Sequence, residues 1–200
     1  MKKKSKKNNF NLKEEYKKSW NYILESKNFI YFIIGIFFVF VLIGFLIPAP
    51  DALAEQILKL IQELIGEIKG MSQGELINFI FFNNLQSSFF GMVLGVVFGI
   101  FPVIAIIANG YLLGFVASMS VESEGILVLW RLLPHGIFEL PAVFISLGLG
   151  LKLGTFIFQK KKIKLLKEYF WNSLRVFLFI VTPLLIIAGI IEGSLIFMFA

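Results

Sequence analysis

The sequence predicts an all-α integral membrane protein, built as a five-helix transmembrane bundle with an amphipathic extracytoplasmic helix after the first span. Hydrophobic residues make up 58% of the 200 residues and charged residues 16%, a balance that excludes a soluble globular domain. Uncharged runs reach the length that crosses a bilayer. Lysine-rich segments alternate with acidic ones, as expected when they lie on opposite sides of a membrane. The sequence has no cysteine, which excludes disulfides and thiolate metal sites.

The amino-terminal residues 1–28 form a basic segment that we expect in the cytoplasm. They hold nine Lys against three Glu, and the formal net charge of +6 is concentrated there. The segment has few aromatic residues and adjoins a predicted span, which indicates a membrane-surface anchor and a topology signal rather than a nucleic-acid site. Residues 29–200 are expected to form a single transmembrane domain.

The first span is predicted at residues 29–47, an uncharged run of 19 residues that Pro48 and Pro50 end. An amphipathic helix is predicted at residues 51–69, because leucine and isoleucine recur there every three or four residues opposite a mostly acidic face. An acidic face disfavours adsorption to anionic lipid. We therefore expect this helix to lie over its own bundle, with docking of a partner as the alternative.

Residues 76–120 carry no charge over 45 positions, which fits two spans joined by a tight turn. The predicted spans are residues 77–98 and 102–120, with the turn at residues 99–102. Each span carries small residues at helical spacing that predict close helix packing, either within the chain or in a homodimer. These residues are Gly91 and Gly95 in the first of the two spans, with Gly99 directly after it on the same helix face, and Gly110 and Gly114 in the second span.

A short loop at residues 121–131 leads to the fourth span, residues 132–151, and the fifth span is predicted at residues 174–198. Between them, residues 152–167 hold six Lys and no acid. The positive-inside rule places this segment and the amino terminus in the cytoplasm, which requires an even number of crossings between them. Five spans satisfy this condition and leave the carboxyl terminus outside the plasma membrane.

The candidate site is the chain's single histidine and a nearby carboxylate in the fourth span. His135 and Glu139 are four residues apart and share one helix face, which continues through Ala142, Ser146 and Gly150. Ionisable groups in a span normally face the bundle interior and mark a functional site. The alternative is a hydrogen-bonded pair that only holds helices together.

The predicted topology brings other polar residues to the depth of this pair. Glu192 in the fifth span and Asn83 and Asn84 in the second lie towards the outer side, so we expect one cluster that binds a ligand or a proton. Asn109, in the third span, is expected to hydrogen-bond to a neighbouring helix.

The polar and glycine positions together resemble the stage II sporulation protein M family of multi-pass membrane proteins, across most of residues 25–195. The most specific block is Pro-His-Gly-Ile-Phe-Glu-Leu-Pro at residues 134–141. The other positions that carry the resemblance are Asn83, Asn84 and the glycines after them, Asn109 with Gly110 and Gly114, and Pro183, Ala188 and Glu192. In spore-forming bacteria, the resemblance implies work alongside wall-degrading partners in engulfment. It implies no biochemical activity, and relatives also occur in archaea.

Three functions fit these residues. We expect a non-enzymatic membrane organiser that recruits other membrane or envelope proteins. The alternative is a small transporter, channel or lipid-handling protein that uses the polar cluster as a proton, ion or headgroup site. An intramembrane metal enzyme is disfavoured, because the HExxH pattern is absent and a fourth ligand is missing. No cofactor, metal or nucleic-acid partner is therefore expected.

Overall fold

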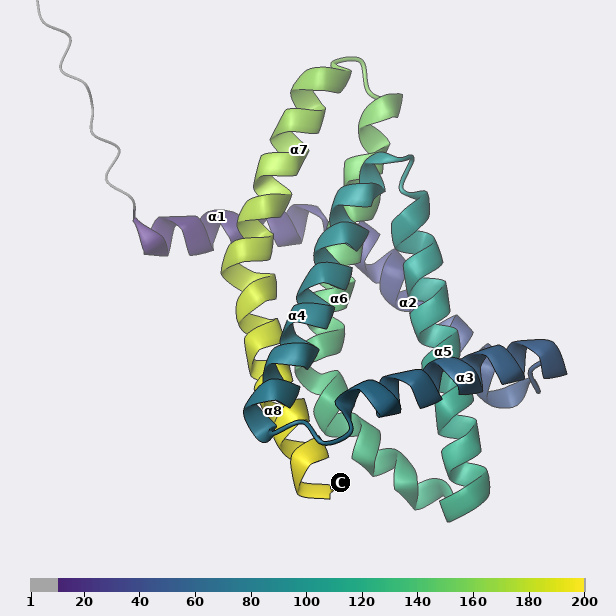
Figure 1. Cartoon of the computed structure of the whole chain (residues 1–200). Helices are drawn as coiled ribbons and strands as arrows, with labels where there is room; N and C mark the ends of the chain where they lie inside the picture. The colour runs from purple at the N-terminus through teal and green to yellow at the C-terminus, as the bar shows by residue number, and fades with distance from the viewer. Residues whose placement is uncertain (1–10, 200) are drawn as a thin grey trace, which may run out of the picture.

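The regular elements of the chain are all helical over residues 11–199, the part that the computed structural model describes; the side chains of residues 130–135 fall outside that description. In order the elements are α1 (Leu12–Glu25), α2 (Lys27–Leu46), α3 (Asp51–Ile68), α4 (Gln73–Val93), η1 (Leu94–Val96), α5 (Ile100–Glu124), η2 (Ile126–Leu132), α6 (Leu133–Gly154), η3 (Thr155–Phe158), α7 (Lys162–Val176), η4 (Phe177–Val181) and α8 (Thr182–Phe199) (Figure 1).

Five helical stretches of this described region are long and apolar enough to cross a membrane, as the sequence predicts. They are Lys27–Leu46, Gln73–Val96, Ile100–Glu124, Gly136–Phe158 and Lys162–Phe199. The predicted turn is also present, because α4 is followed by η1 and Gly99, directly before α5, has a φ of 70°, a conformation that glycine adopts without strain. The predicted number of spans is thus confirmed.

One predicted boundary is wrong. The predicted loop at residues 121–131 is helical, because α5 continues through Glu124 and η2 follows it. The helical stretch that contains the predicted fifth span begins earlier, at Lys162, since no glycine or proline interrupts the sequence before Pro183. Its 38 residues would measure about 57 Å, against roughly 30 Å of hydrocarbon, so the lysine-bearing part of α7 extends beyond the membrane.

The basic amino-terminal segment contains a helix that the sequence analysis did not predict. The Asn11 side chain accepts a hydrogen bond from the Lys13 backbone N–H at 3.2 Å and caps the start of α1. Helix α1 runs across the bundle rather than along it, and α2 begins directly after Ser26 (Figure 1). Residues 1–10 lie outside the described part of the chain.

Helix α3 forms where a helix was predicted, yet it covers little of the bundle. Ile57 is its one buried side chain, whereas Leu60 is 58% exposed and Leu64 49% exposed. Figure 1 shows α3 lying across the direction of the spans. The expectation that α3 lies over its own bundle is therefore wrong for most of its length, because too few side chains of the chain reach its apolar face.

Glycines bring the backbones of the spans into contact in two pairs. In the α2–α5 pair, a Cβ at Gly110 would lie 2.6 Å from the Phe37 carbonyl oxygen, and one at Gly114 would lie 2.9 Å from the Phe45 backbone nitrogen. In the pair formed by α4 with η1 and α6, Gly95 lies against Gly150, and a Cβ at Gly150 would lie 2.9 Å from the Gly91 carbonyl oxygen. Both predicted glycine seams are therefore filled within the chain.

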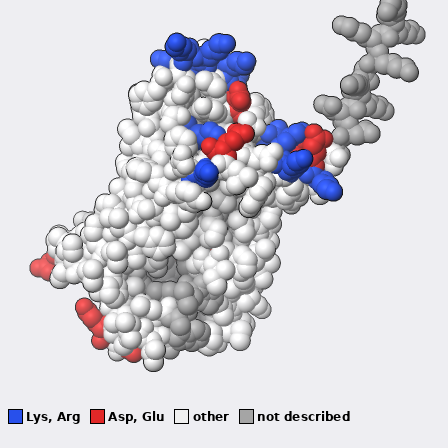
Figure 2. Space-filling model, turned by 180° about the vertical axis from the view of Figure 1, so that it is seen from behind, with Lys and Arg blue, Asp and Glu red and all other residues white. Residues whose placement is uncertain are grey.

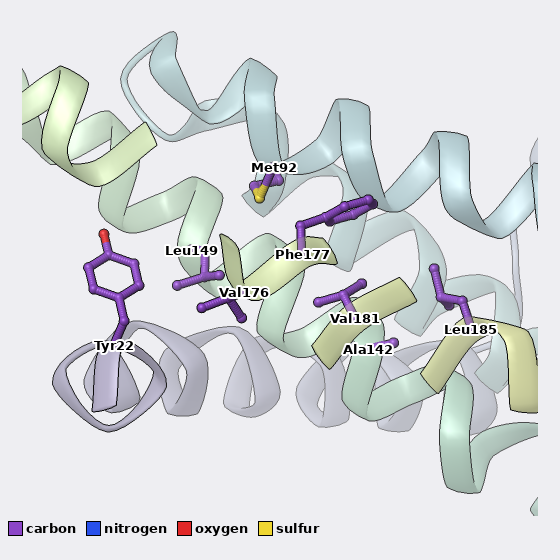
Figure 3. Close-up of a cluster of buried hydrophobic side chains, with 8 residues drawn as sticks. All are labelled: Tyr22, Met92, Ala142, Leu149, Val176, Phe177, Val181 and Leu185. Carbon is purple, nitrogen blue, oxygen red and sulfur yellow. The ribbon is translucent and has the colours of Figure 1, made fainter. Parts of the chain in front are cut away.

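Helix α6 is the central element of the bundle. An 18-residue window of its stretch is 56% buried, while the corresponding windows of the other four stretches are 22–33% buried. One buried cluster joins α6 to α2 and α5 through Ile33, Phe37, Ile106 and Leu147. Figure 3 shows the second cluster, in which side chains of α4, α6, η4 and α8 meet Tyr22 of α1. Helix α6 thus joins the α2–α5 pair to the helices α4 and α8.

The charges separate the molecule into two ends. Lys and Arg gather around α1 and the tip of the α6–α7 hairpin, which we call the lysine-rich end (Figure 2). The opposite end, formed by α3, the end of α5 and the end of α8, displays acidic side chains on the face in Figure 2, and we call it the acidic end.

The two ends lead to a topology prediction. Because the chain has no cysteine, Gln56→Cys in α3 and Lys161→Cys in the α6–α7 hairpin each introduce one thiol, at exposed positions. We expect an impermeant maleimide to label the first variant in intact cells and the second only after permeabilisation. Labelling of both variants from one side would contradict the five-span arrangement.

The glycine contacts lead to a stability prediction. Gly114→Ala should lower the free energy of unfolding by about 1–3 kcal/mol, because its Cβ meets the backbone of α2. The matched control is Gly35→Ala, where nothing lies within 4 Å of an added Cβ. That variant should melt at an unchanged or higher temperature in detergent, since alanine favours helix by about 0.5–1 kcal/mol over glycine. Equal shifts for the two variants would show that the seam does not hold the bundle.

Candidate functional site

A hydrogen bond between α4 and α6 fixes the register of the predicted site. The Ser146 hydroxyl donates to the Ser88 backbone oxygen at 2.8 Å, and both serines are buried. Ala142 and Gly150, on the same face of α6, are also buried. The small and polar stripe predicted on the fourth span is therefore a contact surface against α4.

This register places the two intramembrane carboxylates at similar depths. Glu139 lies seven residues before Ser146, and Phe81 lies seven residues before Ser88, so Glu139 is level with Phe81. An added Cβ at Gly189 of α8 would lie 3.2 Å from the Phe81 Cβ. Glu192 is three residues beyond Gly189, which is an axial offset of about 4.5 Å from Glu139.

Glu139 and Glu192 each lie on a helix face whose neighbouring residues are buried in the bundle. Glu192 shares a helix face with Ala188 and Leu185, which are 2% and 1% exposed. One carboxylate oxygen of Glu139 and one of Glu192 each expose less than 1 Å² to solvent, although each residue as a whole is half-buried. Both residues take part in an interaction within the chain. The parts of α6 and α8 that lie towards the acidic end therefore each carry one shielded carboxyl group.

The other predicted site residues are placed differently. Asn84 is half-buried on α4, one turn from Ser88 towards the acidic end. It therefore belongs to the same unit as the carboxylates, formed by α4, α6 and α8, which we call the α4–α6–α8 unit. Asn83 is exposed. Asn109 is exposed on α5, next to Gly110, which is buried at the α2 contact. The backbone of His135 belongs to α6, and its side chain lies outside the described residues. The structure thus places Glu139, Glu192 and Asn84 at similar depths on α6, α8 and α4, whereas Asn109 lies on a different helix, α5.

Proline shapes the helices that carry the carboxylates. Pro183 has no N–H, and its ring clashes with the normal position of the carbonyl four residues earlier. The residues before it, Phe177–Val181, accordingly form the π-helix η4 instead of an α-helical turn. Pro141 lies inside α6, two residues after Glu139. Irregular backbone of this kind is frequent at functional sites.

A buried lysine forms a second polar cluster, at the lysine-rich end, which the sequence analysis missed. Lys152 of α6 is 8% exposed, and its Nζ donates to the Ser26 Oγ at 3.0 Å. The same nitrogen lies 3.9 Å from the centre of the Tyr22 ring and 5.4 Å from that of Tyr169. The signal in the sequence is a lysine between glycine-rich apolar residues, at the start of the basic segment 152–167.

This lysine cluster fixes α1 to the bundle. The Ser26 hydroxyl also donates to the Tyr22 backbone oxygen at 2.7 Å, and burial raises the pKa of the Tyr22 phenol. At the other end of α1, the Arg175 Nε donates to the Glu15 carboxylate at 2.6 Å. Hydrogen bonds from Lys18 and Arg175 lower the pKa of Glu15. The unpredicted helix is therefore held at both ends.

The chemistry of these clusters is limited by what they contain. Within the described residues, no group of three or more His, Cys, Asp and Glu side chains could hold a metal ion. The two carboxyl groups at the acidic end can exchange protons or hold a cation, and the amine at the lysine-rich end is already engaged by an aromatic ring and a hydroxyl.

Comparison with known proteins identifies a relative and a family. An uncharacterized protein of Methanocaldococcus jannaschii is 33% identical over 116 residues, which are 55% of this chain and 65% of that protein. No solved structure matches the chain. The family described as stage II sporulation protein M matches residues 30–195, from the second residue of the first predicted span to near the end of α8. Because this match covers most of the sequence, the chain belongs to the stage II sporulation protein M family.

Proposed function

We propose that this protein is a non-enzymatic component of the plasma membrane that recruits partner proteins during remodelling of the membrane or cell envelope. The observation that carries the proposal is the exposed apolar face of α3, a helix of 18 residues with one buried side chain. Both ends of α3 are tethered to spans, so the helix stays at the membrane surface. The positive-inside rule places it outside the cell, with the amino terminus inside.

Two features of α3 favour a protein partner. Leu60 and Leu64 are exposed apolar side chains one turn apart, the spacing by which a helix docks in a groove. The polar face carries Asp51, Glu55, Glu63 and Glu67 against Lys59, a charge that anionic lipid repels and a basic partner surface attracts. In this proposal, the glycine-packed bundle anchors α3 at the membrane surface.

A transport function is the second candidate, and the acidic-end carboxylates favour it. Glu139 and Glu192 each have one shielded carboxylate oxygen inside the α4–α6–α8 unit, and Pro141 lies two residues after Glu139. Ionisable side chains inside spans mark proton and ion paths in pumps and transporters. Proton or cation flux into proteoliposomes, abolished by Glu139→Gln, would favour this candidate over the recruitment role.

The recruitment proposal predicts that α3 is needed for function and dispensable for folding. Leu60→Ser with Leu64→Ser should leave the detergent melting temperature unchanged, because both side chains are exposed, while the gene no longer complements a deletion strain. The matched control is Lys59→Ser with Glu63→Ser on the polar side of the same helix, which should retain complementation. Full complementation by the leucine double variant would overturn the recruitment role of α3.

The carboxylates lead to a separate prediction about coupling. If Glu139 and Glu192 share one site, the melting shifts of Glu139→Gln and Glu192→Gln should not add in the double variant, since changing one carboxyl alters the surroundings of the other. A functional site should tolerate the isosteric amide with little unfolding, while the cellular phenotype is lost. Strictly additive shifts would separate the two residues, and full complementation by the folded double variant would make them structural.

A further inference from the structure

The side chains of α1 divide into three arcs at about 100° per residue. The arc facing the bundle contains Glu15, Ser19 and Tyr22, of which Ser19 is 0% and Tyr22 6% exposed. The polar arc contains Glu14, Lys18, Asn21 and Glu25. The third arc carries an apolar stripe of Leu12, Tyr16, Trp20 and Leu24, which are 53%, 41%, 57% and 51% exposed. The chain itself therefore leaves most of the stripe uncovered.

Two contacts show which way the apolar stripe of α1 faces. Glu15 pairs with Arg175, whereas the ring of Tyr16 packs edge-on against Phe179 with 5.6 Å between ring centres. The chain from Lys162 to Phe199 runs from the lysine-rich end to the acidic end, so Phe179 lies one turn deeper than Arg175. The stripe is therefore on the side of α1 that faces the membrane interior, and the polar arc faces away from it.

The surroundings of the stripe have the chemistry of a membrane interface. Lys17 borders the stripe beside Leu24, and Lys13 lies between Trp20 and Leu24; from both positions long side chains reach headgroups. Trp171 of α7 is 63% exposed at the same end, and tryptophan and tyrosine concentrate where hydrocarbon meets water. Leu178, next to Phe179, is 55% exposed on the span below. The stripe thus continues the surface that this span presents to lipid.

We propose that α1 is an anionic-lipid-binding helix, with Leu12, Tyr16, Trp20 and Leu24 seated at the boundary of headgroups and acyl chains and with Lys13 and Lys17 on anionic headgroups. Lipid is the occupant because the stripe faces the hydrocarbon side and joins the lipid-facing surface of a span. Lys13 and Lys17, on or beside the stripe, can pair with anionic headgroups. This role is independent of partner recruitment at the acidic end.

The test places one fluorophore on the full-length protein in vesicles. Trp130→Phe with Trp171→Phe leaves Trp20 as the single tryptophan. Its quenching is measured by aqueous acrylamide and by phosphatidylcholine brominated near the top of the acyl chain. The matched control adds Trp20→Phe and Asn21→Trp, which moves the fluorophore by one residue from the apolar stripe to the polar arc.

Brominated lipid should quench Trp20 and acrylamide should not, with the opposite result for the control. The anionic lipid should be enriched around Trp20. A given fraction of brominated phosphatidylglycerol in phosphatidylcholine should therefore quench Trp20 as strongly as a roughly threefold larger fraction of brominated phosphatidylcholine does. Lys13→Gln with Lys17→Gln should reduce this preference. Equal acrylamide access at both positions would overturn membrane seating, and protection from both quenchers would mean that protein covers the stripe. Equal quenching by the two lipids, or an unchanged preference in the lysine variant, would overturn anionic-lipid binding.

Discussion

Close contact between helix backbones is the constraint on which this bundle depends. Between spans that lie in lipid, burial of apolar side chains gives little drive for association, so dispersion contacts at short range must supply it. Gly110 and Gly114 let α5 reach the backbone of α2, and Gly95 and Gly150 let η1 and α6 touch. Because α6 takes part in both buried clusters, these two seams set the position of the other spans.

The position of the acidic-end carboxylates follows from these seams. The small-residue face of α6 that contacts α4 carries Ser146, whose hydrogen bond to Ser88 sets the register of the two helices. Glu139 lies two turns before Ser146 on α6. The contacts of Gly189 and Gly193 with α4 bring Glu192 to a similar depth. Two shielded carboxyl groups inside the α4–α6–α8 unit are thus a consequence of backbone packing, whichever of the two proposed functions they serve.

The two ends of the molecule differ in how tightly their surface helices are held. Helix α1 is fixed by Lys152, Ser26 and the pair of Glu15 with Arg175, and its aromatic residues contact the span beneath it. Helix α3 is fixed through its connections and through Ile57. A helix held against its own bundle is suited to a constant surface such as lipid, whereas a helix with few contacts can dock to a partner and separate from it again.

The sequence by itself determined the class of fold, the number of spans and the residues of the small-residue stripe, because hydropathy, helical periodicity and charge alternation are local properties of the chain. It also marked Glu139 and Glu192 as unusual, since a carboxylate in an apolar run is visible without a structure. Only the tertiary structure decided that α1 lies across the lysine-rich end, that α3 stands largely uncovered and that Asn109 is exposed on α5, outside the α4–α6–α8 unit. Those outcomes depend on which residues of distant segments meet, as Lys152 meets Ser26 across 126 positions, and no local pattern encodes such a meeting.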